Sequence, residues 1–197
     1  LFFIVSVFLG SIMAQSSIEE KWLTVDRIYS GEFSTERFGP SKWLEEGNAY
    51  TTLEKNINTT NKDIVKYDTK SGKRSILITA QELTPIGQSM PLEIADYSWS
   101  NDGQQLLVFT NTKRVWRTNT KGDYWLFDLK SKTLKKVAPT LPASSLMFAK
   151  FSADDRQIAF VSENNLFVQD LATDKIKQLT FDGTTDIING NFDWVYE

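Results

Sequence analysis

The residues best suited to chemistry lie at the end of the sequence, with one arginine near its middle. The last seven residues, NFDWVYE, combine acids with aromatics, namely Asp193, Trp194, Tyr196 and Glu197. Arg117 follows a tryptophan in the stretch VWRTNTKGDYW. Carboxylates can bind an ammonium group, and a guanidinium can donate paired hydrogen bonds to an oxygen acceptor. Taken alone, however, the ending is better explained as a surface loop with a buried tryptophan, and Arg117 fits a solvated side chain equally well.

Composition excludes several kinds of active site. The 197 residues contain neither cysteine nor histidine, so the chain cannot supply a disulfide, a thiolate nucleophile, the usual zinc ligands or a histidine-based triad. With 22 basic and 25 acidic residues spread along the sequence, a nucleic-acid partner is not expected. The acids of FDGTTD, from Phe181, resemble part of a calcium loop but lack its closing glutamate. We therefore expect no metal and no cofactor.

The N-terminus is apolar. Residues 1–14, LFFIVSVFLGSIMA, are too few to span a bilayer and suit the core of a signal peptide. No methionine or basic segment precedes them, so we expect an N-terminally incomplete export signal; an uncleaved anchor is the alternative. The predicted location is periplasmic or secreted, with membrane attachment still open.

A motif occurs three times along the chain. An aromatic residue is followed within four positions by acids and a turn former in WLEEG from Trp43, WSNDG from Trp99 and FSADD from Phe151. A strand-like run follows each copy, and a second such run then ends near an aspartate, before a polar turn and another strand. The steps between copies are about 50 residues, near the length of a propeller blade.

The repeats predict an all-β protein, a β-propeller of about three blades. We expect a lead-in segment and first strands over residues 15–42 and the incomplete propeller over residues 43–197. Since a propeller ring needs at least four blades, three cannot close it. The expected fold is therefore a partial propeller truncated from a larger ring.

Several strings resemble one family. IYSGEF, RFGPSKWLEEGNAYTTLE, WRTNTKGDYWLFDL and INGNFDWVYE are similar to the N-terminal propeller of dipeptidyl peptidase IV and its bacterial relatives, in the prolyl oligopeptidase class of serine peptidases, from about Leu23 to Glu197. The resemblance implies an eight-bladed propeller over an α/β-hydrolase domain. It also implies release of dipeptides with Pro or Ala in second position from peptides with a free N-terminus.

The resemblance assigns roles to individual residues. Glu197 matches the first of a run of glutamates whose second and third members bind the substrate ammonium group, supported by the loop of Asp193, Trp194 and Tyr196. Arg117 matches an arginine that donates to a substrate carbonyl.

The catalytic triad and its Gly-x-Ser-x-Gly elbow have no counterpart in these residues, so the chain alone should be inactive. The hydrolase domain is the implied partner, and a homodimer is possible. The alternative is a non-enzymatic exported propeller that binds a partner.

Overall fold

The computed structural model describes residues 22–35, 39–56, 61–115 and 117–192. By its internal contacts the chain divides into Leu1–Phe38 and Gly39–Glu197, and each part is described by itself. In the first part, helix α2 (Val25–Tyr29) begins after Thr24, whose hydroxyl oxygen accepts a hydrogen bond from the Arg27 amide at 3.2 Å. Within the described ranges no helix is long and apolar enough to cross a membrane.

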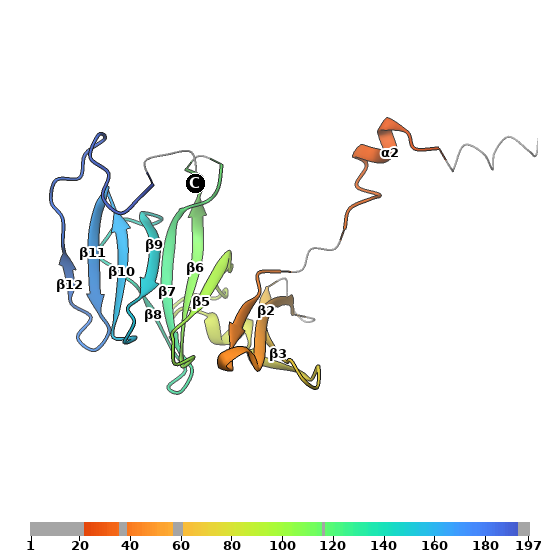
Figure 1. Cartoon of the computed structure of the whole chain (residues 1–197), viewed down its shortest axis with the longest axis horizontal. Helices are drawn as coiled ribbons and strands as arrows, with labels where there is room; N and C mark the ends of the chain where they lie inside the picture. The colour runs from red at the N-terminus through yellow and green to blue at the C-terminus, as the bar shows by residue number, and fades with distance from the viewer. Residues whose placement is uncertain (1–21, 36–38, 57–60, 116, 193–197) are drawn as a thin grey trace, which may run out of the picture. The chain divides into compact units, whose positions relative to one another are not determined.

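The second part consists of three four-stranded antiparallel meanders (Figure 1). Their strands follow one another in the sheet in chain order. The first meander contains β1 (Lys42–Leu44), β2 (Ala49–Lys55), β3 (Lys62–Asp68) and β4 (Arg74–Ile78). The second contains β5 (Asp96–Trp99), β6 (Gln105–Lys113), β7 (Lys121–Asp128) and β8 (Thr133–Lys136), and the third contains β9 (Leu146–Phe151), β10 (Gln157–Ser162), β11 (Asn165–Asp170) and β12 (Ile176–Gln178). Short 3-10 helices η1 (Glu45–Gly47) and η2 (Ala80–Leu83) follow β1 and β4.

Strands of the second and third meanders pair with each other at one corner of the two sheets. The second half of β7, from Trp125, pairs with β8, but its first residues pair with the start of β9, where Gly122 lies opposite Leu146. Gly122 also lies against β6: a Cβ atom there would come within 2.3 Å of the Phe109 ring and 2.7 Å of the Thr110 carbonyl oxygen. Only glycine allows the strands to approach this closely.

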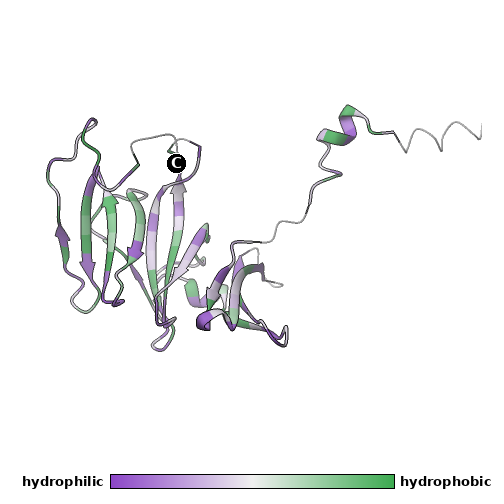
Figure 2. Cartoon of the chain, viewed as in Figure 1, coloured by the Kyte–Doolittle hydropathy of each residue, from purple (hydrophilic) through white to green (hydrophobic). Residues whose placement is uncertain are grey.

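Apolar side chains fill the space between neighbouring meanders. One buried cluster joins the first meander to the second, and includes Leu53, Ile64, Tyr97, Leu106 and Phe127. A second cluster joins the second to the third, and includes Leu107, Tyr124, Leu146, Ile158 and Phe160. Figure 2 shows hydrophobic and hydrophilic residues interspersed along the strands, as expected where strand faces differ in burial.

The turn after the first strand of a meander has the same hydrogen bonds in the second and third meanders. The Ser100 hydroxyl donates to the Asp102 carboxylate at 2.6 Å and accepts from the Gln105 amide at 2.9 Å. In the third meander, 52 residues later, Ser152 donates to Asp154 at 2.6 Å and accepts from the Gln157 amide at 3.0 Å. The repeated motif is thus one turn built twice.

The turn between the third and fourth strands is the same in all three meanders. Asp68, Asp128 and Asp170 each accept two hydrogen bonds on one carboxylate oxygen, from the amide and the hydroxyl of the residue three positions later. Hydrogen bonding by these hydroxyl and amide groups holds the pKa of all three carboxyl groups below its ordinary value. The polar turns expected from the sequence therefore depend on ionised aspartates.

The all-β partial propeller expected from the sequence is confirmed, with one correction. Sequence reasoning placed three strands in each repeat and put Trp43, Trp99 and Phe151 at the start of a turn. In the structure Trp43 lies in the middle of β1, and Trp99 and Phe151 are the last residues of β5 and β9, directly before the turn. These three first strands are what the pattern missed. β1 and β5 have only three and four residues, too few to show alternation.

Candidate functional site

Arg117 lies at the tip of the long hairpin between β6 and β7. The tip closes with a hydrogen bond of 3.1 Å from the Val115 amide to the Thr118 carbonyl oxygen, and the Arg117 side chain is exposed. No described residue forms a hydrogen bond or ion pair with this guanidinium. Its neighbour Trp116 lies outside the described residues. Within the described part of the chain the donors of Arg117 are thus unengaged, and its contact with a substrate carbonyl stays a prediction.

The base of this hairpin is held by the buried carboxylate of Asp123. Its two oxygens accept hydrogen bonds from the Asn111 side chain at 2.7 Å and the Ser144 amide at 3.0 Å, and Lys136 lies 3.2 Å away. Burial raises the pKa of Asp123, but these three partners outweigh it, so the pKa lies below its ordinary value. Since Asn111 has a positive φ of 47° at a break in the β6–β7 register, this network fixes the direction in which the hairpin leaves the sheet.

A second segment, residues 179–192, follows β12 and is tied to the turn between β10 and β11. The side-chain oxygen of Asn165 accepts hydrogen bonds from the Thr180 hydroxyl at 3.1 Å and the Gly183 amide at 3.0 Å. The carbonyl oxygen of Asn164 accepts from the amide of Asn189 at 3.0 Å and from its side chain at 3.1 Å. Five residues thus connect the segment to the third meander.

The hairpin and this segment lie at the same end of the sheet, drawn uppermost in Figure 1. The hairpin is the connection between β6 and β7, and the segment begins beside the connection between β10 and β11. β9 lies between the two in the sheet. Ser144 donates to the Asn111 carbonyl oxygen at 2.6 Å, and the next residue, Ser145, contacts Ser162 at 3.5 Å. One short stretch therefore links the two loop bases.

Of the five site residues predicted from the sequence, only Arg117 belongs to the described part of the chain. The other four, Asp193, Trp194, Tyr196 and Glu197, lie outside it, and their roles stay predictions. The residue before them, Phe192, packs edge-on against Phe148 of β9, with 6.1 Å between ring centroids.

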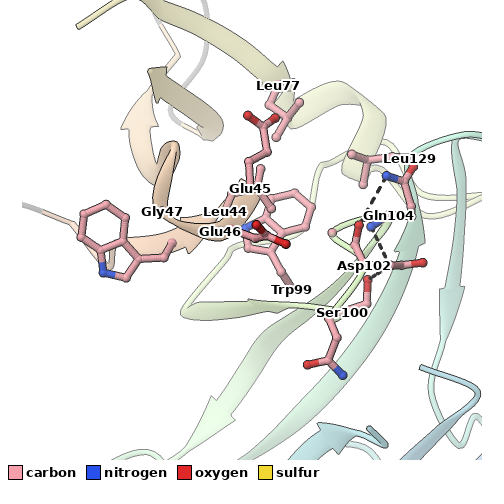
Figure 3. Close-up of a pocket in the computed structure, with 13 residues that line it drawn as sticks. Leu44, Glu45, Glu46, Gly47, Leu77, Trp99, Ser100, Asp102, Gln104 and Leu129 are labelled. Atoms are coloured by element: carbon pink, nitrogen blue, oxygen red, sulfur yellow. Dashed lines mark hydrogen bonds between the residues drawn. The ribbon is translucent and has the colours of Figure 1, made fainter. Parts of the chain in front are cut away.

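A groove of about 1040 Å³ lies at the opposite end, between the turns of the first and second meanders (Figure 3). It is lined by the two repeated motifs, including Leu44, Glu45, Trp99 and Asp102. Its acids are largely engaged, because Glu45 forms an ion pair with Lys66 and Asp102 accepts from its own turn. Since the nine residues of β6 separate this groove from the Arg117 hairpin, it is not part of the same site.

Among residues 22–35, 39–56, 61–115 and 117–192, no three His, Cys, Asp or Glu side chains come together in a way that could hold a metal ion. Asp182, part of the stretch resembling a calcium loop, accepts a hydrogen bond of 3.0 Å from Asn189 instead.

Sequence reasoning missed the residues that hold the connections between meanders. Asp63, Asp123 and Asn165 each stand near the start of a third strand, five positions before the turn aspartate. Each is at most 9% exposed, and each accepts a backbone hydrogen bond from the stretch that follows its meander. The available signal was this constant spacing of five, which marks a polar residue within an apolar strand.

Known proteins resemble this chain both in sequence and in fold. Residues 100–197 match the family model described as the dipeptidyl peptidase IV (DPP IV) N-terminal region. A probable dipeptidyl-aminopeptidase B of Ajellomyces dermatitidis is 29% identical over 183 residues, which cover 89% of this chain and 20% of the relative. A probable dipeptidyl-aminopeptidase B of Ajellomyces capsulatus is 33% identical over 137 residues, 68% of this chain and 15% of the relative.

The crystal structure of dipeptidyl peptidase 4 from Porphyromonas gingivalis superposes with a TM-score of 0.73 and 27% identity, over 88% of this chain and 24% of that one. The chain therefore spans between 15% and 24% of the length of these relatives. Its repeated four-stranded meanders and their shared turns define a β-propeller protein. It belongs to the dipeptidyl peptidase IV family, of which it carries the N-terminal propeller region.

Proposed function

We propose that this chain is the substrate-positioning propeller region of an exported serine-type dipeptidyl peptidase, which releases dipeptides with Pro or Ala in second position from free peptide N-termini. The observation that carries the proposal is the placement of Arg117. Its exposed guanidinium stands at the same end of the sheet as the segment that leads into Asp193 and Glu197.

The division of labour follows from charge. An α-amino group has a pKa near 8 and is mostly cationic at neutral pH, so acids following Tyr196 would attract it. The Arg117 guanidinium would donate to a carbonyl of the same peptide. Two contacts at a fixed separation define how far the scissile bond lies from the N-terminus, and this sets the product length at two residues.

The first test uses the full gene product and two chromogenic substrates, Ala-Pro-p-nitroanilide and its N-acetylated form. We expect release of p-nitroaniline from the free amine only, and inactivation by an organophosphorus reagent that modifies an active-site serine. Equal cleavage of both substrates would contradict recognition of the ammonium group. Absence of any cleavage would favour the alternative, a propeller that binds a partner without catalysis.

The second test replaces Arg117. Because a hydrogen bond to or from a charged group contributes roughly 1.5–3 kcal/mol, R117A should lower kcat/KM about tenfold to a hundredfold. Most of the change should be in KM. R156A is the matched control, since Arg156 is exposed in a turn at the opposite end of the third meander. If R117A and R156A have the same kinetics as the wild type, Arg117 does not contact the substrate.

A further inference from the structure

We propose that Asn165 is a positioning residue for recognition of the substrate ammonium group. The inference rests on the function proposed above and adds to it a residue that the resemblance did not supply. It starts from the repeated position occupied by Asp63, Asp123 and Asn165.

In each meander, the side chain at this position accepts a hydrogen bond from a backbone amide in the stretch that follows the fourth strand. In the first meander, Asp63 accepts from the Ala80 amide at 2.7 Å. In the second, Asp123 accepts from the Ser144 amide at 3.0 Å. In the third, Asn165 accepts from the Gly183 amide at 3.0 Å. The first two stretches lead to the next meander, whereas the third leads to Asp193 and Glu197.

The third stretch is held more extensively than one bond suggests. Thr180 donates to the Asn165 side chain at 3.1 Å, and its own hydroxyl oxygen accepts from the Leu166 amide at 2.9 Å. The amide group of Asn165 also donates to the Glu163 carbonyl oxygen at 3.1 Å. Asn165 is only 9% exposed, and its loss would leave the half-buried donors of Thr180 and Gly183 without this acceptor.

Two glycines confirm how closely this segment approaches the third meander. A Cβ atom on Gly183 would lie 2.5 Å from the Asn164 carbonyl oxygen and 2.5 Å from the Asn165 side-chain nitrogen. A Cβ atom on Gly190 would lie 2.6 Å from Leu166 and 2.7 Å from Val161. The segment is therefore in close contact with the meander at both glycines. At the first of these contacts, Gly183 lies directly against the Asn165 side chain.

The consequence concerns precision at the site. An ammonium-binding acid must be held within about half an ångström to discriminate a charged N-terminus. The side chain that fixes Thr180 and Gly183 fixes where the chain leaves the sheet, ten residues before Asp193. Weakening it should impair recognition of the ammonium group more than the chemical step.

The experiment compares N165A, N165D and D63A in the full gene product, using dipeptidyl and N-acetylated p-nitroanilide substrates. N165A should raise KM for the free-amine substrate about tenfold with kcat changed less than threefold, and should reduce the preference for the free amine. N165D keeps the acceptor oxygens that Asp63 and Asp123 use, so its KM should be close to the wild-type value. D63A removes the equivalent residue of the first meander, and should lower thermal stability without changing the preference for the free amine.

If N165A fails to fold, T180V keeps the test available, because it removes one donor to Asn165 and should raise KM in the same direction. An unchanged KM in N165A and T180V, or an equal loss of amine preference in D63A, would overturn the positioning role. If the wild-type protein itself releases no dipeptide, the proposed function fails instead, so the two failures are distinguishable.

Discussion

Replacing Asp155 tests whether one carboxylate holds the second and third meanders together. Its oxygens accept hydrogen bonds from the amides of Asn101 and Asp102, both at 2.9 Å, and from the Asn101 side chain at 3.0 Å. All three donors belong to the second meander, whereas Asp155 belongs to the third. Removing the carboxylate by D155A therefore breaks three hydrogen bonds across the junction.

The free energy that these three hydrogen bonds contribute can be estimated from the exposure of the residues that form them. Asn101 and Asp102 are exposed and Asp155 is half-buried, so each bond is near the lower end of the usual net contribution, about 0.5–1 kcal/mol. Three bonds then amount to about 2 kcal/mol, which corresponds to roughly a 30-fold change in a local opening equilibrium. Hydrogen exchange of the peptide that contains Asn101 and Asp102 should accelerate by that factor.

D155G separates the hydrogen bonds from the backbone. Asp155 has a φ of 55°, a conformation that costs a residue with a Cβ atom about 1 kcal/mol and glycine almost nothing. D155G should therefore lose the same protection at Asn101 and Asp102 as D155A but unfold at higher urea. Unchanged exchange in both variants would refute the bridging role, and equal urea midpoints would refute the backbone argument.

Two further predictions concern packing and pH. G122A should destabilise the protein by about 2–4 kcal/mol, measured by urea unfolding, because the new Cβ atom would overlap the Phe109 ring and the Thr110 carbonyl oxygen. In the control G87A the new Cβ atom meets no atom within 4 Å, so this variant should lose only the stability that the strain of its positive φ costs. Equal losses of stability in the two variants would contradict the close approach at Gly122. The lowered pKa of Asp128 means that its ionised form stabilises the fold above the unfolded-state pKa of about 3.9, and that this contribution disappears as pH falls through the lower folded-state value. Replacing the three turn aspartates Asp68, Asp128 and Asp170 by asparagine keeps a hydrogen-bond acceptor in each turn, so the triple variant should show a weaker loss of melting temperature between about pH 5 and pH 2 than the wild type. If the triple variant and the wild type had the same pH profile, the charge of these carboxylates would not contribute to stability.

The sequence predicted those parts of the fold that are encoded by neighbouring residues. The turns at Ser100 and Ser152 and at the three aspartates are local, because donors and acceptors lie within five positions of each other, and they were found from residue type and spacing. The first strands were missed because β1 and β5 are short and gain their hydrogen bonds from a partner strand.

The candidate site was less accessible to sequence reasoning. Arg117 was identified through the resemblance, and the structure adds that it is exposed at a hairpin tip. Asp123 and Asn165 were not identified, because their partners Ser144 and Gly183 lie 21 and 18 residues away in the chain. Such contacts become visible only when the meanders are placed side by side.

The position held by Asp155 in the third meander is Gly103 in the second, where a Cβ atom would lie 3.1 Å from Leu44. A charged side chain thus bridges one junction, whereas the equivalent position of the other has no side chain and lines the groove between the first and second meanders. These modules share a common outline but are not interchangeable. A chimaera in which one meander replaced its neighbour would keep correct hairpins but would have mismatched contacts between meanders. To lengthen or shorten such an array, each meander should therefore be transferred together with the facing turn of the meander before it.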